Sequence, residues 1–319
     1  MKYAFLFPGQ GAQEPGMVKD IADTFSEARA VIDAVGEITG VDMPKLLWET
    51  DKTTLSRSDN SQLSVMTAAL AVCAVLKAHG IVPSAVMGFS LGEFPALYAA
   101  GVLSFEDVVR VVRARGTIMQ KVCEDIARAN EGHAPGMSAV IGLAPEKVQE
   151  LCAGLADVYA ANLNSPKQTV VSGTFDGLAA LEKAAAEAGA RRALRLAVAG
   201  PYHSPLMQAA ADEFKTVLAA VPFNDPGCAL FSNVTGAQVM SGQAVKENAI
   251  LHLTNPVRWT AEEAALGAYM VADGGAENWT LYETGVGAVL SGLWKDSEHG
   301  GTWKCTALTT VAAVQEVLV

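Results

Sequence analysis

The sequence predicts an α/β protein in which a main domain carries a smaller inserted unit. Short apolar segments of strand length alternate along the chain with longer apolar or amphipathic segments that are typical of helices. The sequence Gly-Phe-Ser-Leu-Gly at 88–92 stands between one such strand and the helix that follows it. Residues 125–195 have a different order, β-α-β-β-α-β, which is typical of a ferredoxin-like unit that buries its own small core.

The main domain is expected to comprise residues 1–124 and 196–319. Its first strand is KYAFLF, which ends at the turn PGQG. Residues 61–79 are apolar and rich in alanine and predict a buried helix that Gly80 stops. SAVMGF predicts a second short strand, and EFPALYAAG predicts the helix that leaves it, despite Pro95 in its first turn. CALFSNVTG predicts a further strand, and NWTLYETGVGAVLSGLWK predicts a strand, a Gly-rich turn and a helix that return to the same sheet.

The composition favours a compact globular enzyme. Half of the 319 residues are hydrophobic and 18% are charged, unlike a disordered or fibrous chain. The net charge of -11 opposes binding to nucleic acid or to an anionic membrane. The first apolar run is too short for a secretory signal, and the longest uncharged stretch, Ser61 to Leu76, is shorter than a bilayer span. We therefore expect a soluble cytoplasmic protein, and the five widely spaced cysteines predict neither a metal site nor a disulfide framework.

Ser90 is the first candidate catalytic residue. A strand, a tight turn and a helix around a G-x-S-x-G sequence form the context that a nucleophile elbow requires. Gly88 and Gly92 would let the strand and the helix approach closely around a strained Ser90. The alternative is an ordinary glycine-rich loop.

A charged residue interrupts the apolar face of the helix that begins at Ser104. At 100° per residue, Arg115 falls in the middle of the apolar face, while Gln120 falls on the opposite side. A buried guanidinium without an anion is too costly to keep. Arg115 therefore either forms a structural ion pair with a carboxylate of the protein or binds an anionic ligand.

His203 is the candidate general base. It follows a predicted strand, on a turn fixed by Gly200, Pro201 and Pro205, and ligands of open α/β sheets bind at strand ends. A histidine there is placed to take the proton of Ser90, although a loop histidine without a catalytic role has the same signature. His252 is a weaker candidate, and three histidines are expected at the surface: His79, His133 and His299.

Eight segments, in order, resemble the malonyl-CoA:acyl-carrier-protein transacylase family of fatty acid and polyketide synthesis. They are FPGQGAQ, GFSLGE, RGTIMQ, GMSAVIGL, ANLNSPKQTVVSG, GPYHSPLM, NPVRWT and ETGVGAVLSGL, and they cover essentially the whole chain. The resemblance implies an α/β-hydrolase-like main domain with an inserted ferredoxin-like subdomain.

The resemblance also implies roles for single residues. Ser90 is then the nucleophile and His203 its base, oriented by the main-chain carbonyl of the residue at position 252. The backbone N–H groups of Gln10 and Leu91 form the oxyanion hole. Arg115 binds the free carboxylate of the malonyl group, and a bidentate guanidinium suits a carboxylate. The residues that the resemblance places near the gorge, with less defined roles, are Gln62, Asn162, Asn164 and His252.

The activity so implied is ping-pong transfer of malonyl from malonyl-CoA, through a malonyl-serine ester, to the phosphopantetheine thiol of an acyl carrier protein. No metal or other bound cofactor is expected. Carrier proteins are typically acidic, so docking needs a local basic patch, and we expect it at Arg191, Arg192 and Arg195. The alternative is that these arginines only face solvent on an edge strand.

The chain departs from the family pattern at four positions. Phe89 stands where the family commonly has histidine, His252 where it has glutamine, and Val286 and Ala288 where it has proline and lysine. If His252 acts only through its carbonyl, its side chain is free to vary. Two other functions stay open: a serine acyl hydrolase or thioesterase on the same fold, and a silent domain that only docks carrier proteins.

Overall fold

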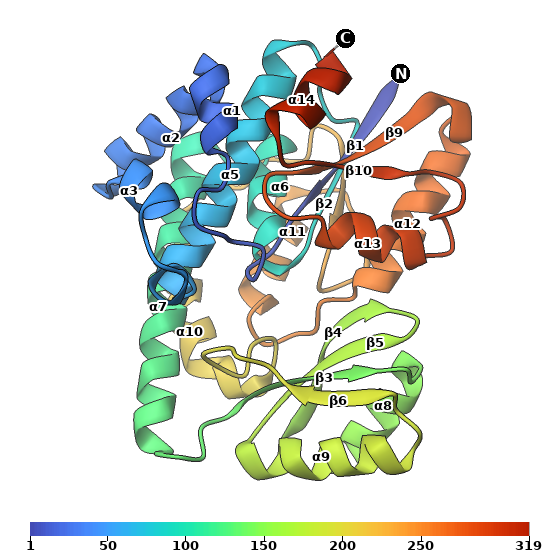
Figure 1. The fold of residues 1–319 in the computed structure, drawn as a ribbon. Helices are drawn as coiled ribbons and strands as arrows, with labels where there is room; N and C mark the ends of the chain where they lie inside the picture. The colour runs from blue at the N-terminus through green and yellow to red at the C-terminus, as the bar shows by residue number, and fades with distance from the viewer. Residues whose placement is uncertain (319) are drawn as a thin grey trace.

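The main sheet is built around a central buried strand, β1. The computed structural model describes residues 1–318, and Figure 1 shows the sheet in the upper part of the molecule. Five of its strands are parallel and β8 is antiparallel to its neighbour β7. In spatial order the strands are β10 (Cys305–Leu308), β9 (Trp279–Thr284), β1 (Lys2–Phe7), β2 (Ala85–Gly88), β7 (Ala229–Ser232) and β8 (Ala237–Val239). The fold is therefore an α/β fold, as the sequence predicts.

Helices cover both faces of this sheet. Successive side chains of a strand point to opposite faces, and in β1 the side chains on both faces are apolar and therefore need to be buried. Phe5 and Phe7 pack into one apolar cluster, and Ala4 and Leu6 pack into the other. The first cluster lies against α5, α6 and α7, and the second against α12 and α13 (Figure 1). The helices of the main domain are α1 (Lys19–Thr24), α2 (Ser26–Thr39), α3 (Met43–Trp48), α4 (Lys52–Leu55), α5 (Ser58–Ala78), α6 (Glu93–Ala99), α7 (Phe105–Ala129), α10 (Gln208–Ala219), α11 (Gly242–Leu251), α12 (Trp259–Ala272), α13 (Val289–Asp296) and α14 (Val311–Leu318).

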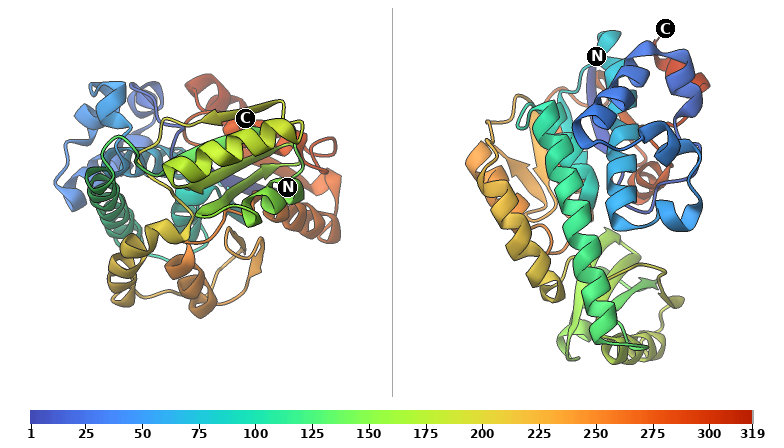
Figure 2. Two further views of the ribbon diagram at one scale, coloured as in Figure 1. Left: turned by 90° about the horizontal axis from the view of Figure 1, so that it is seen from below. Right: turned by 90° about the vertical axis from the view of Figure 1, so that its left-hand side faces the viewer.

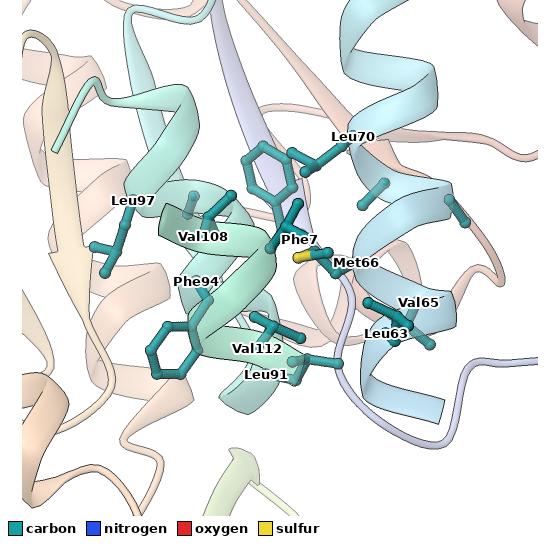
Figure 3. Close-up of a cluster of buried hydrophobic side chains, with 14 of the residues drawn as sticks. Phe7, Leu63, Val65, Met66, Leu70, Leu91, Phe94, Leu97, Val108 and Val112 are labelled. Carbon is teal, nitrogen blue, oxygen red and sulfur yellow. The ribbon is translucent and has the colours of Figure 1, made fainter. Parts of the chain in front are cut away.

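The helix α5 is the apolar centre of the larger cluster. Figure 3 labels the side chains of Leu63, Val65, Met66 and Leu70 on this helix, grouped with Phe7 and with residues of α6 and α7. By length and composition α5 is also the one helix among residues 1–318 that could cross a membrane. This helix of 21 residues extends beyond both ends of the uncharged stretch from Ser61 to Leu76, so the stretch alone is shorter than a bilayer span although the whole helix is long enough. Most of α5 is buried inside the fold, as in the core helix of a globular protein.

The inserted unit is a separate four-stranded antiparallel sheet, drawn below the main sheet in Figure 1. The spatial order β4-β5-β3-β6 and two helices against one face match the ferredoxin-like order that the sequence predicts. Val140, Val171 and Leu178 belong to its own small core. Its elements are β3 (Gly136–Ile141), α8 (Pro145–Ala153), β4 (Val158–Ser165), β5 (Gln168–Gly173), α9 (Phe175–Glu187) and β6 (Arg192–Arg195).

The long helix α7 leads from the main domain to the inserted unit (Figure 2). It begins after Ser104, where the sequence predicts the helix, and the Ser104 hydroxyl accepts a hydrogen bond from the Asp107 N–H. The expected domain boundary at residue 125 falls inside this helix. The expectation that Gln120 lies on the exposed side of α7 is wrong. Gln120 is buried, and its amide oxygen accepts a hydrogen bond from the Ser58 N–H at the start of α5.

Candidate active site

Ser90 lies on a strained turn between β2 and α6. Its φ is 51°, in the left-handed region that few residues other than glycine adopt. A Cβ atom at Gly88 would lie 2.0 Å from the Gly92 carbonyl oxygen, and one at Gly92 would lie 2.0 Å from the Phe7 carbonyl oxygen. Only glycine fits at both positions, so the backbone has the geometry of a nucleophile elbow rather than of an unconstrained loop.

The side chain of His203 lies within hydrogen-bond distance of the Ser90 hydroxyl. The His203 Nε2 atom lies 2.7 Å from the Ser90 Oγ atom, and the His203 Nδ1 atom lies 3.0 Å from the His252 carbonyl oxygen and 3.2 Å from that of Asn255. Carbonyl oxygens only accept, so Nδ1 carries the proton and Nε2 is free to accept the Ser90 hydroxyl. The carbonyls belong to the C-terminal end of α11 and the residues after it, where helical carbonyls lack partners within the helix.

The surroundings of His203 keep its imidazole neutral. Burial lowers the pKa of His203 well below the ordinary value, and the nearby His252 and Arg115 lower it further. The two carbonyl contacts oppose this shift without cancelling it. A neutral imidazole beside a serine hydroxyl is the state that a general base requires.

Arg115 is buried, with 1% of its surface exposed, and no carboxylate among the described residues pairs with it. Its Nη1 donates to the Gln62 Oε1 atom at 2.6 Å, its Nη2 to the His252 Nδ1 atom at 3.2 Å, and its Nε has no partner within residues 1–318. Phe94 lies under the guanidinium, whose central carbon is 5.3 Å from the ring centre. Burial lowers the pKa of Arg115 to about 10, so it remains a cation at neutral pH. Of the two explanations for the buried arginine, the structural ion pair is not observed within residues 1–318.

The His252 side chain has contacts of its own within the site, besides the role expected for its carbonyl. It is 1% exposed and lies between Arg115 and Glu93. Its Nε2 atom is 3.4 Å from the Glu93 Oε2 atom, a long electrostatic contact rather than a hydrogen bond. Burial lowers the pKa of His252, and Arg115 adds to this shift while Glu93 opposes it.

Three buried polar residues of the site were not among the candidates from the sequence. Asn233 accepts a hydrogen bond from the Ser90 N–H at 2.7 Å and donates to the Gly88 carbonyl at 2.6 Å. Its own N–H donates to Glu93, and its side chain also donates to Glu262. Burial and the neighbouring Glu93 raise the pKa of Glu262 well above its ordinary value. The sequence signal that could have identified them is their position along the chain: Asn233 directly follows a strand, and Glu93 directly follows the elbow sequence.

A cavity of about 410 Å³ opens over Ser90 and His203, between the two units of the fold. Asn162 and Asn164 of β4 lie in its wall, as does Gln10 of the first loop. The backbone N–H groups of Gln10 and Leu91 donate to no acceptor within residues 1–318, which leaves them available to an oxyanion.

Arg115 and Gln62 lie behind the wall of this cavity rather than in it. Met119 is part of the wall, and its sulfur accepts a hydrogen bond from the Gln62 Nε2 atom at 3.2 Å. Gln62 in turn holds Arg115. The candidate carboxylate site is therefore one residue layer away from the cavity in this structure.

The arginines expected at a docking surface differ from one another. Arg191 and Arg192 are exposed near the edge strand β6 and form no ion pair among the described residues. Arg195 forms an ion pair with Glu182 at 2.9 Å, and its guanidinium lies over the Phe175 ring. Its charge is thus partly neutralised within the chain.

The chain is similar to known acyltransferases over most of its length. Residues 4–273 match the family model of the acyl transferase domain. The malonyl CoA-acyl carrier protein transacylase of Bacillus subtilis is 39% identical, over 92% of this chain and 90% of the relative. That of Escherichia coli K12 is 36% identical, over 92% of both.

Solved structures agree. A malonyl-transacylase in complex with a type II PKS acyl-carrier protein superposes with a TM-score of 0.90 at 32% identity, covering 100% of this chain and 99% of that one. An acyl carrier protein S-malonyltransferase from Vibrio cholerae gives a TM-score of 0.89 at 33% identity, covering 99% and 100%.

Proposed function

The chain belongs to the acyl transferase family, and from this membership and the geometry of the site we propose that it is a malonyl-CoA:acyl-carrier-protein transacylase of fatty acid or polyketide synthesis. It transfers a malonyl group from coenzyme A to the phosphopantetheine thiol of an acyl carrier protein. The observation that carries this proposal is the 2.7 Å contact of Ser90 with neutral His203, next to a buried arginine that forms no ion pair with a carboxylate of the described residues.

The first half-reaction forms an acyl-enzyme. The Ser90 oxygen attacks the thioester carbonyl of malonyl-CoA, and its proton passes to the His203 Nε2 atom. The N–H groups of Gln10 and Leu91 stabilise the negative charge on the former carbonyl oxygen. When the tetrahedral intermediate collapses, the carbon–sulfur bond breaks and coenzyme A leaves with the proton from His203. A malonyl-serine ester remains.

The second half-reaction reverses these steps with a different thiol. The phosphopantetheine thiol gives its proton to His203 and attacks the ester carbonyl. When this second tetrahedral intermediate collapses, the bond between the carbonyl carbon and the Ser90 oxygen breaks, His203 returns the proton to Ser90, and the malonyl thioester of the carrier protein leaves. Every step uses the residues of this chain and the two thiols. We also propose that the enzyme works in the cytoplasm, since its net charge of -11 opposes binding to anionic membrane surfaces.

Arg115 gives the acyl pocket its preference for acyl groups that carry a free carboxylate, such as malonyl. The malonyl carboxylate reaches Arg115 past Met119 and Gln62 and pairs with the guanidinium, whose Nε–H is free. The approach requires Gln62 to move, because it now separates Arg115 from the cavity. Asn162 and Asn164, which line the cavity, contact the substrate.

A serine acyl hydrolase or thioesterase on the same fold is the alternative, but a buried cation gives no advantage with neutral acyl groups. A silent docking domain would need none of Ser90, His203 and Arg115. Carrier-protein docking is proposed at Arg191 and Arg192, with Arg195 contributing less because Glu182 already pairs with it.

The proposal is tested by intact-protein mass spectrometry after mixing with malonyl-CoA or acetyl-CoA. We expect a malonyl adduct on the wild type, none on Ser90→Ala, and at least a 100-fold slower malonyl loading of Arg115→Ala. Acetyl loading should be slow in the wild type and should not fall in Arg115→Ala. Equal loading of both acyl groups, or accumulation of free acid without an adduct, would support the hydrolase instead.

A further inference from the structure

His252 joins the carboxylate-binding arginine to the catalytic base. Its carbonyl oxygen accepts a hydrogen bond from His203, while its imidazole, on the same residue, accepts one from Arg115. The ring also lies 5.4 Å from the His203 ring and 5.6 Å from the Phe94 ring, measured between centres. The residue is therefore in contact with both halves of the site.

The protonation of the His252 imidazole follows from its neighbours. A guanidinium only donates, so the Nδ1 atom that faces Arg115 is the unprotonated one and the proton is on Nε2. Nε2 points toward the Glu93 carboxylate, 3.4 Å away, which favours this tautomer. Glu93 is itself held by the Asn233 N–H.

The Arg115 guanidinium is held at two of its three nitrogens. Gln62 accepts from Nη1 and His252 accepts from Nη2, while Phe94 packs against the plane of the group. If Gln62 moves to admit a carboxylate, His252 is the remaining hydrogen-bond partner among the described residues. A guanidinium held by a rigid ring loses little freedom when its ligand binds.

We propose that the imidazole of His252 is a positioning residue that holds Arg115 in the orientation that accepts the malonyl carboxylate, and so sets selectivity for malonyl over neutral acyl groups. This inference rests on the proposed function. The imidazole does not touch the reacting atoms, and it acts through Arg115. Its effect is therefore expected on the choice of acyl group more than on the chemistry at Ser90.

The ring must be neutral for this role. Protonation would remove the acceptor at Nδ1 and add a second cation beside Arg115. The charged or titratable groups that face the ring are Arg115 on α7, Glu93 on α6 and His203, and Glu262 of α12 lies behind Glu93 through Asn233. Of these groups, Glu93 raises the pKa of the ring and Arg115 lowers it, while burial favours the neutral form.

The test compares two amides that differ by one methylene group. His252→Gln retains an acceptor oxygen long enough to reach Arg115, whereas the side chain of His252→Asn is too short, and both keep the backbone carbonyl for His203. The measurement is the rate of adduct formation with malonyl-CoA and with acetyl-CoA. We expect His252→Asn to lower the malonyl-to-acetyl ratio of rates about 10- to 100-fold, and His252→Gln to restore most of it. His133→Asn, at an exposed histidine, is the matched control.

The outcomes separate the inference from the proposed function. If the wild type forms no malonyl adduct, both are wrong. If the wild type does and the ratio is unchanged in His252→Asn, or falls equally in His252→Gln, only the inference is wrong. If His252→Asn does not fold, the ratio in His252→Gln decides, because a ring that only fills space would leave that variant with lowered selectivity.

Discussion

The side chain of Asn233 accepts a hydrogen bond from the Ser90 N–H at 2.7 Å and donates one to the Gly88 carbonyl at 2.6 Å. One amide thus holds both sides of the turn that carries the nucleophile. The left-handed backbone of Ser90 is strained, and such a conformation persists only where the surroundings hold it. Asn233 is 1% exposed, so water does not replace these bonds.

We predict that Asn233→Ala lowers both stability and activity. The buried Gly88 carbonyl and the partly buried Ser90 N–H lose their partners, and an unsatisfied buried group costs about 1–3 kcal/mol. We expect the free energy of unfolding to fall by about 2 kcal/mol or more, and Ser90 acylation to slow at least tenfold because the turn relaxes. Urea titration and the rate of adduct formation check the two effects.

Asn278→Ala, at an exposed asparagine, is the control for Asn233→Ala and should be close to wild type in both assays. If Asn233→Ala is destabilised but acylates at the wild-type rate, Asn233 supports the fold and not the nucleophile.

The fall of kcat/KM at acidic pH measures the protonation of His203. Because burial, His252 and Arg115 lower its pKa, we expect kcat/KM for malonyl-CoA to stay constant as pH falls through about 6.5, the ordinary imidazole value, and to decline only below it. Removing a neighbouring cation raises the pKa of an imidazole. In Arg115→Gln, the fall of kcat/KM should therefore occur at higher pH. This variant is assayed with acetyl-CoA, which has no free carboxylate that would need Arg115. A fall of the wild-type kcat/KM at or above pH 6.5 would contradict a neutral, buried base.

Local backbone geometry and periodicity made part of the site predictable. The elbow depends on neighbouring residues, so the strand, Gly88, Gly92 and the helix were enough to place Ser90. Arg115 was recognised because a charge on an apolar helical face is visible from spacing alone. Both predictions needed only short-range information.

Long-range contacts were not predictable in this way. Ser90 and Asn233 are 143 positions apart, and the sequence does not specify which asparagine supports the turn. His299, which is expected at the surface, is partly buried, with 19% of its side chain exposed, for the same reason. It packs between Trp294 and Trp303 and against Gly267, where a Cβ atom would lie 1.9 Å from its ring. Its polar sequence neighbours gave no sign of these partners.

Glu263 predicts a pH dependence of stability. Burial raises its pKa to about 8, while Trp259 donates a hydrogen bond to it. The folded state thus keeps a proton that the unfolded state releases, so this group makes the free energy of unfolding fall as pH rises from about 4.5 to about 8. Glu263→Gln should remove part of that slope. The free energy of unfolding of the variant, compared with that of the wild type, should therefore be more favourable at pH 8 than at pH 5. Urea titrations at several pH values measure the slope, and identical slopes would show that Glu263 is ionised in the folded protein.

Carrier-protein docking is predicted to depend on Arg191 and Arg192, which are exposed and unpaired within the described residues. An acidic partner is attracted by such a patch even though the whole chain is negative, because charges beyond about 8 Å are screened at physiological salt. The double substitution Arg191→Glu with Arg192→Glu should raise the KM for carrier protein roughly tenfold at physiological salt and leave that for malonyl-CoA unchanged. Arg110→Glu with Arg128→Glu changes the charge equally on α7 and serves as the control. An equal rise of both KM values, or the same effect from the control pair, would show that net charge and not this patch governs docking.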